Sequence, residues 1–231
     1  MDHFINIYNN RADDYHRMMA LEDVEGNLAG ALKRVSSLTG KRVLDLGTGT
    51  GRLPMMFADQ TEQMVGLDLH AGMLQEHLRQ RVRQNGLWGL VQGDMQLLPL
   101  PTGWADVVMA GWAIGHFVGW YGEDWPTRIG RVLREMHRVV RPDGSLIIIE
   151  TLTTGSLEPA PPSKGLATYY AWLESEWGFQ RQQIRTDYQF DSVDEAVAHT
   201  EFFFGSDLAT AIREQGWARL PEWTGVWAKQ V

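Results

Sequence analysis

Val43-Leu44-Asp45-Leu46-Gly47-Thr48-Gly49-Thr50-Gly51 is the stretch that decides the fold of this chain. It begins as a largely apolar run that is typical of a strand buried on both faces. Three glycines at alternate positions follow, and residues 52–58 are typical of the start of a helix. This order brings backbone N–H groups and the positive end of a helix up to a ligand, and glycine is needed because a Cβ would block the approach. The alternative is a tight strand–helix turn without a ligand.

Size, charge and composition limit the kinds of protein this chain can be. Its 231 residues are enough for one sizeable α/β domain, and we expect a single domain over 1–231. A net charge of −8 repels phosphates, so we expect no nucleic acid and no membrane as partners. The absence of cysteine excludes disulfides and thiolate metal sites. There is no signal sequence and no apolar run of ~20 residues, so we expect a cytoplasmic protein.

An acidic residue also stands at the tip of the second predicted strand, which covers residues 64–69. A carboxylate at the position of Asp68 can accept hydrogen bonds from both hydroxyl groups of a ribose. Leu69 and Met73 are placed to enclose the sugar and an adenine between apolar surfaces. The alternative for Asp68 is a capping role for the helix that we expect over 70–85.

The glycines are spaced G-x-G-x-G, whereas dinucleotide-binding folds use G-x-G-x-x-G. The third strand, predicted over 90–95, carries Gly93-Asp94-Met95, and an apolar run with prolines follows it. In these features residues 40–150 resemble the class I S-adenosylmethionine-dependent methyltransferases. The resemblance implies that the glycines contact the methionine part of the cofactor and that Asp45 helps hold its amino group, directly or through water. It also implies that Asp94 and the Met95 N–H bind the adenine.

The same resemblance extends to a tyrosine-rich segment before the core. In similar proteins this segment forms a helix or lid over the cofactor, and Tyr8 and Tyr15 are the matching side chains here. The alternative is an amphipathic helix that covers a sheet edge. The cofactor-binding residues that we predict are Tyr8, Tyr15, Asp45, Gly47, Thr48, Gly49, Gly51, Asp68, Leu69, Met73, Gly93, Asp94, Met95, Ala110 and Gly111.

Aromatic side chains follow the fourth strand, predicted over 105–110, and recur in a helix predicted over 166–177. Ligands sit beyond the carboxyl ends of strands in open α/β sheets, so we expect these side chains to shape a substrate pocket. His116 can take a proton near neutral pH and is the candidate base; the alternative is a structural histidine. The helix over 166–177 either caps the acceptor site, packs flat on the core or forms a dimer surface. The predicted substrate-pocket residues are Trp112, His116, Phe117, Trp120, Tyr169 and Tyr170.

We predict an α/β fold with a Rossmann-like, seven-stranded, mostly parallel sheet, helices on both faces and an antiparallel last strand. Its parts are an N-terminal helical lid (1–38), a cofactor-binding core (40–150), a cap insertion after the fifth strand (151–182), and C-terminal strands and helices (183–231). Further predicted elements are helices over 24–38, 124–140, 192–205 and 206–216, a turn over 141–144, and strands over 145–150, 183–190 and 219–229.

The resemblance implies methyl transfer from S-adenosylmethionine to a small-molecule acceptor by in-line displacement, with S-adenosylhomocysteine as product and no metal. We expect a monomer or a homodimer. Two other classes stay open at this point: a non-catalytic S-adenosylmethionine-binding protein, and an NAD(P)-dependent oxidoreductase. The identity of the acceptor and of the methylated atom does not follow from these residues, because the matching motifs all belong to the cofactor half.

Overall fold

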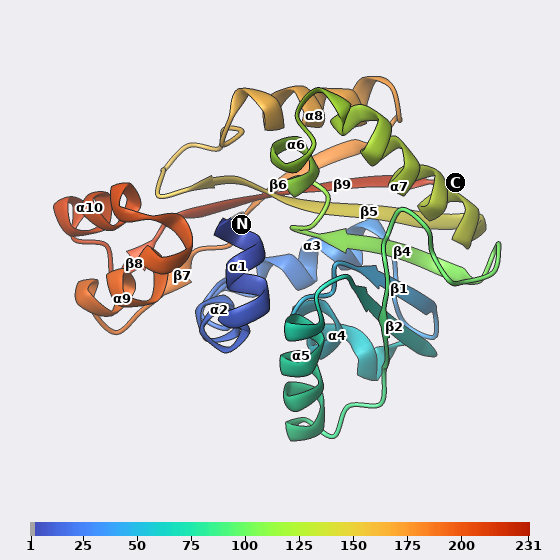
Figure 1. The fold of residues 1–231 in the computed structure, drawn as a ribbon, viewed down its shortest axis with the longest axis horizontal. Helices are drawn as coiled ribbons and strands as arrows, with labels where there is room; N and C mark the ends of the chain where they lie inside the picture. The colour runs from blue at the N-terminus through green and yellow to red at the C-terminus, as the bar shows by residue number, and fades with distance from the viewer. Residues whose placement is uncertain (1–2) are drawn as a thin grey trace.

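A seven-stranded sheet in the order β3-β2-β1-β4-β5-β9-β6 forms the centre of the computed structural model, which describes residues 3–231 (Figure 1). Neighbouring strands are parallel except for β9, which runs antiparallel to both β5 and β6. The predicted sheet and its antiparallel last strand are therefore confirmed. The strands are β1 (Arg42–Leu46), β2 (Gln63–Asp68), β3 (Gly89–Gln92), β4 (Ala105–Gly111), β5 (Val140–Thr154), β6 (Gln180–Arg185) and β9 (Glu222–Gln230).

Helices cover both faces of this sheet, as predicted (Figure 1). Two apolar cores result, one on each face, and the central strands contribute alternate side chains to both. Because both faces are covered, β1 is buried along almost its whole length, which explains its apolar sequence. One face carries α3 (Asn27–Val35), α4 (Arg52–Phe57) and α5 (Ala71–Arg83), and the other carries α6 (His116–Trp120), α7 (Trp125–Val139) and α8 (Lys164–Ser175).

A separate group of elements lies beyond one end of the sheet. Two short strands pair there with each other, next to the first two helices (Figure 1). This group has its own small apolar core, to which Met18 contributes from the N-terminal segment. Its elements are α1 (His3–Asn10), α2 (Ala12–Met19), β7 (Tyr188–Gln189), α9 (Val193–Phe204), α10 (Ser206–Gln215) and β8 (Arg219–Leu220).

The segment after β5 takes one of the positions that the sequence left open. Residues 151–182 contain α8, which lies flat on the sheet and connects β5 to the parallel strand β6 (Figure 1). Tyr169, Tyr170 and Leu173 of α8 are buried in the sheet core, which makes α8 a sheet-covering helix. The true insertion runs from β7 to β8, between β6 and β9.

Several predicted elements differ in their bounds. Helix 24–38 is shorter, at Asn27–Val35. The turn predicted over 141–144 lies within β5, because the Asp143 N–H donates to the Val231 carbonyl and the Val231 N–H donates to the Gly144 carbonyl. Strand 183–190 is divided into β6 and β7, and strand 219–229 is divided at Pro221, which has no N–H for a ladder bond.

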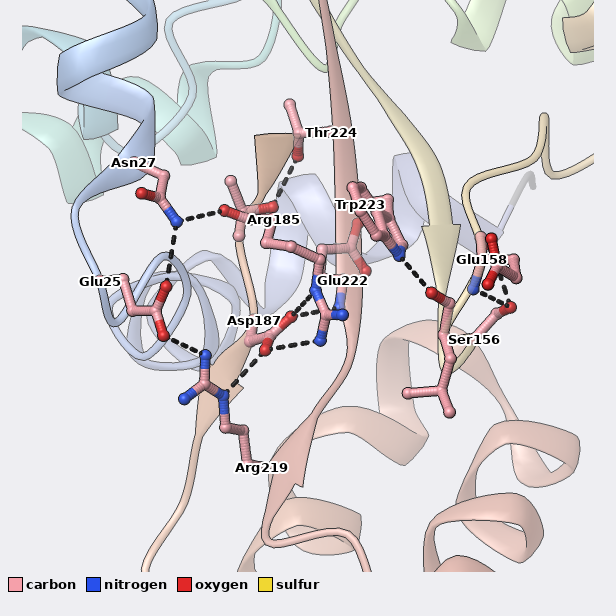
Figure 2. Close-up of polar contacts among 12 residues, drawn as sticks. Glu25, Asn27, Ser156, Glu158, Arg185, Asp187, Arg219, Glu222, Trp223 and Thr224 are labelled. Atoms are coloured by element: carbon pink, nitrogen blue, oxygen red, sulfur yellow. Dashed lines mark hydrogen bonds and ion pairs between the residues drawn. The ribbon is translucent and has the colours of Figure 1, made fainter. Parts of the chain in front are cut away.

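Asp187, between β6 and β7, fastens the insertion to the end of the sheet (Figure 2). Arg185 donates to its two oxygens at 2.7 and 2.8 Å, Arg219 donates at 2.8 Å, and the Glu222 N–H donates at 3.0 Å. Arg219 also donates to Glu25 at 2.6 Å, which ties in the segment before α3. Burial would raise the pKa of Asp187, but the hydrogen bonds from Arg185 and the Glu222 N–H outweigh it and keep the pKa low. The carboxylate is thus charged and fully bonded.

Candidate functional site

Two adjoining cavities lie at the carboxyl ends of the parallel strands. The smaller, of about 80 Å³, is bordered by the glycine loop and by the ends of β2 and β3, and the larger, of about 650 Å³, extends toward the insertion. The walls that they share are Tyr8, Tyr15, Trp112, His116 and Trp120. A ligand in one cavity therefore borders a ligand in the other. The predicted residues that line the smaller cavity are Tyr8, Tyr15, Gly47, Gly49, Asp68, Leu69, Met73, Gly93, Asp94, Met95, Gly111, Trp112, His116, Phe117 and Trp120.

The glycine loop forms the floor of the smaller cavity. Gly47 and Gly49 have φ angles of 65° and 54°, a region that disfavours residues with a Cβ. A Cβ at Gly47 would lie 2.4 Å from the Cβ of Ala113, and one at Gly49 would extend toward Met73 at 3.6 Å. The bare backbone of these two glycines thus leaves the room that a ligand needs.

Asp68 stands beside this loop with its carboxylate on the cavity. It is only 6% exposed, and its two oxygens accept from the Gly49 and His70 N–H groups, each at 2.8 Å. Burial raises the pKa of Asp68, and these N–H bonds act against that shift. Each oxygen has two lone pairs, so each can accept one further hydrogen bond from a ligand.

Asp94 occupies the rim of the same cavity and, unlike Asp68, is exposed to solvent. Its carboxylate accepts from the Gln96 N–H at 2.8 Å, which fixes the turn after β3. Asp68 and Asp94 therefore border one crevice together with the glycine loop. Binding of one nucleoside by both acids requires this arrangement.

Four predicted cofactor residues, Asp45, Thr48, Gly51 and Ala110, line neither cavity. Asp45 is buried and accepts from the Thr48 hydroxyl at 2.7 Å, and burial raises its pKa to about 7. The Thr48 N–H donates to the carbonyl of Leu67 in the neighbouring strand. Asp45 and Thr48 thus brace the loop from inside, and a contact of Asp45 with the cofactor stays a prediction.

The third glycine has a packing reason that sequence reasoning missed. Gly51 has a φ of 102°, and a Cβ there would fall 2.5 Å from the ring of His77 in α5. Trp88 Nε1–H donates to His77 Nε2 at 2.7 Å, so that nitrogen carries no proton. Burial lowers the pKa of His77 to about 4. A neutral histidine therefore supports the glycine loop from below.

The larger cavity is mainly aromatic. His116 stacks on Trp120 with ring centres 5.0 Å apart, and its Nε2 lies 2.8 Å from the hydroxyl of Tyr8. Tyr8 comes from α1 and His116 from α6, so the N-terminal segment forms part of the wall. Both rings face the boundary between the two cavities, which is where a proton acceptor would have to lie.

Trp112 separates the glycine loop from the larger cavity. It has a φ of 50°, which is unusual for a residue with a side chain, and its N–H donates to the Ile149 carbonyl at 2.7 Å. Arg52 stacks on its ring at 4.3 Å and forms a salt bridge with Glu22, which lines the larger cavity. The carboxylate–guanidinium pair thus connects the helix after the glycine loop to the floor of that cavity.

The two tyrosines predicted for the substrate pocket separate in the structure. Tyr170 lines the larger cavity and donates to the Thr151 carbonyl at 2.7 Å. Tyr169 is 0% exposed and lies in the sheet core, away from both cavities. The predicted pocket position of Tyr169 is therefore corrected: successive residues of α8 point in different directions, and the side of Tyr169 faces α7, where it contacts Trp125.

Several wall residues of the larger cavity were missed by sequence reasoning. Glu150 stands in β5 directly after an apolar run, which is the signal used for Asp68 and could have identified it. Another group of missed residues comes from elements far away in the chain, which no local pattern places here. They are Phe4, Met19, Glu22, Tyr188, Phe203, Phe204 and Leu208.

Comparisons with known proteins find methyltransferases. Residues 44–148 match a family model described as a methyltransferase domain. The malonyl-[acyl-carrier protein] O-methyltransferase of Legionella pneumophila is 30% identical over 168 residues, which cover 71% of this chain and 55% of that protein. The demethylmenaquinone methyltransferase of Lactococcus lactis is 30% identical over 154 residues, covering 63% of this chain and 57% of that protein.

A solved structure shows the same fold. YcgJ from Bacillus subtilis is similar with a TM-score of 0.56 at 18% identity, over 89% of this chain and 97% of that one. Residues 44–148 belong to the class I S-adenosylmethionine-dependent methyltransferase family. The chain spans about half the length of the curated methyltransferases it matches.

Among residues 3–231, no helix is both long and apolar enough to cross a membrane. Within the same described part of the chain, no group of three or more histidine, aspartate or glutamate side chains is arranged to hold a metal ion.

Proposed function

We propose that this protein transfers a methyl group from S-adenosylmethionine to a small-molecule acceptor held in the larger cavity. The single observation that carries the proposal is the convergence of Gly47, Gly49, Asp68 and Asp94 on one crevice that adjoins an aromatic cavity. Family membership supports the choice of cofactor, and the relatives named above are called methyltransferases of a malonyl-carrier protein and of demethylmenaquinone.

The residues present fit this cofactor. The backbone of Gly47 and Gly49 leaves space that a Cβ would fill, and it would face the methionine part. Asp68, with a free lone pair on each oxygen, would accept from the two ribose hydroxyls, and Asp94 with the Met95 N–H would bind the adenine.

When bound, S-adenosylmethionine supplies a methyl group attached to a positively charged sulfur. The task of the protein is then to hold the acceptor in line with that methyl at ~3 Å and to exclude water. Trp112 and Trp120, which line both cavities, would orient the acceptor, because they form the boundary between the two ligands. His116 is the candidate proton acceptor there, with its ring fixed by Tyr8 and Trp120.

The first two helices would act as the lid over the cofactor. Tyr8 and Tyr15 line both cavities, and a smaller cavity of about 80 Å³ is too tight for a nucleoside unless these helices move. The backbone at the end of α1 lies against Gly72 of α5, where a Cβ would meet the Tyr8 and Asn9 carbonyls at 2.8 Å. Glycine at this position therefore permits the lid to seat closely.

Calorimetric titration with S-adenosylhomocysteine tests the cofactor half of the proposal, and labelled methyl transfer to a panel of small molecules tests the acceptor half. We expect one binding site for S-adenosylhomocysteine and transfer of label to at least one small molecule. Binding without any transfer would favour a non-catalytic binding protein. No binding of S-adenosylhomocysteine would contradict the whole proposal.

A further inference from the structure

We propose that the acceptor carries a positively charged nitrogen on a largely apolar body, and that Glu150 binds this nitrogen. The proposal rests on the proposed function and identifies the chemical class of the acceptor. It is carried by the position of the Glu150 carboxylate, by the charges around the larger cavity and by the aromatic surfaces of its wall.

Glu150 is a buried acid with one unused oxygen. It is 5% exposed and lines the larger cavity near the carboxyl end of β5. Its Oε1 accepts from the Gly115 N–H at 2.8 Å, whereas Oε2 has no hydrogen-bond donor among residues 3–231. Burial raises the pKa of Glu150 to about 8. A buried carboxylate is costly without a partner, so a cation that reaches Oε2 from the cavity would be strongly favoured.

The charges around the cavity favour a cation over an anion. No lysine or arginine of the described chain lines it, and its two acidic wall residues are Glu22 and Glu150. Arg52 is the nearest cation to Glu22 and is already paired with it. Glu222 is a further buried acid, and it is close enough to Glu22 for the two carboxyl groups to interact electrostatically. An acceptor with a carboxylate or phosphate would meet this group of acids without a compensating cation.

The wall of the cavity also suits an ammonium group attached to an apolar body. Aromatic faces attract cations, and an apolar cavity of about 650 Å³ accommodates a small molecule. Tyr170 is close enough to Glu150 for the carboxylate to affect the pKa of its hydroxyl. The aromatic wall residues include Phe4, Trp112, Trp120, Tyr170, Phe203 and Phe204.

The charged nitrogen serves as an anchor and is not the methylated atom. An ammonium group has no lone pair, so it cannot attack a methyl carbon. The nucleophile is another atom of the same molecule, directed toward the smaller cavity past Trp112 and His116. Glu150 is therefore a specificity-determining residue, and its role involves no covalent step.

Saturation-transfer NMR on the protein with S-adenosylhomocysteine bound tests this assignment. The probes are phenethylamine, phenethyl alcohol and 3-phenylpropionate, which share a similar body and differ in charge. We expect phenethylamine to bind at least ~10-fold more tightly than the other two. Glu150→Gln keeps a carbonyl oxygen for the Gly115 N–H and removes the charge, so we expect it to abolish that preference. Glu158→Gln, an exposed site outside the cavity wall, is the matched control and should keep it.

The outcomes separate this inference from the proposed function. Affinity for S-adenosylhomocysteine should be the same in the wild type and in Glu150→Gln, and so should the ratio of affinities for S-adenosylmethionine and S-adenosylhomocysteine. A changed ratio would mean that Glu150 serves the sulfonium charge and would overturn the inference. Equal or tighter binding of the carboxylate, binding of none of the probes, or an amine preference that survives in Glu150→Gln would also overturn it. Failure of S-adenosylhomocysteine to bind would instead contradict the proposed function.

Discussion

The two cavities are built in different ways. The floor and rim of the smaller come from consecutive strand ends, Gly47 to Met95, within a stretch of about fifty residues, and only its boundary with the larger cavity is formed by other segments. The larger brings together α1, α2, β5, α8 and the β7–β8 insertion, which are distant in the chain. The difference indicates that recognition of the cofactor is encoded locally, whereas recognition of the acceptor depends on how distant segments pack.

The largest expected effect is that of a side chain placed in the glycine loop. Gly47→Ala puts a Cβ 2.4 Å from Ala113 at a φ of 65°, so we expect S-adenosylhomocysteine affinity to fall more than ~100-fold and stability by about 1–3 kcal/mol. Gly119→Ala is the control in the larger cavity, because a Cβ there meets no atom within 4 Å. Calorimetry and thermal melts measure both. If Gly47→Ala and Gly119→Ala lowered the affinity for S-adenosylhomocysteine equally, the smaller cavity would not be the specific site of the cofactor.

Substitution of the acids that face the cofactor should cause the next largest loss of S-adenosylhomocysteine affinity. Asp68→Ala removes a buried carboxylate, so we expect S-adenosylhomocysteine to bind about 10- to 100-fold more weakly. Asp94→Ala removes an exposed one, and an effect of about 3- to 10-fold is expected. Unchanged affinity in Asp68→Ala would show that the ribose is not placed against this residue.

The pH dependence of stability compares one buried acid from each region. The folded-state pKa of Glu150 is raised from 4.5 to about 8, so the folded protein keeps a proton that the unfolded chain releases, and stability falls as the pH rises between these values. Glu150→Gln should therefore gain more than ~1 kcal/mol relative to the wild type between pH 5 and pH 9. For Asp45→Asn, the same gain should be complete near pH 7, because the pKa of Asp45 is raised to about 7. Denaturant unfolding at several pH values measures both, and parallel curves for all three proteins would refute the assignment.

The smallest effect concerns the lid. Gly72→Ala places a Cβ 2.8 Å from the Tyr8 and Asn9 carbonyls, so α1 should seat less closely and S-adenosylhomocysteine affinity should fall about 3-fold, with faster proteolysis near residue 10. Gly30→Ala in α3 is the control, because its Cβ would meet only the flexible end of Arg34 at 3.4 Å. Unaltered proteolysis and affinity in Gly72→Ala would argue that the first helix is not a lid.

The cofactor half of the chain could be predicted because its signals are local. A buried strand, a turn that only glycine allows and an acid at the next strand end, Asp68, all follow one another in sequence. Even there, the sequence did not separate residues that face the cavity from those behind it. Asp45 and Gly51 match the pattern, yet Asp45 bonds to Thr48 and Gly51 makes room for His77.

The acceptor half could not be predicted in the same way. The aromatic helix over 166–177 has the composition of a cap, but the crossover from β5 to β6 requires a helix on the sheet, and Tyr169 is buried there. Phe203 and Phe204 reach the cavity only because β7 and β8 carry the insertion to the end of the sheet, and Asp187 holds it there through pairs with Arg185 and Arg219. Such long-range contacts leave no periodic pattern in the sequence.

One titration tests the central claim most directly: calorimetry of the wild-type protein with S-adenosylhomocysteine and, separately, with NADH. The crevice between Gly47, Asp68 and Asp94 predicts one site for S-adenosylhomocysteine with a Kd of about 10 μM or tighter, and no detectable heat of binding with NADH. Binding of NADH together with no binding of S-adenosylhomocysteine would contradict the account.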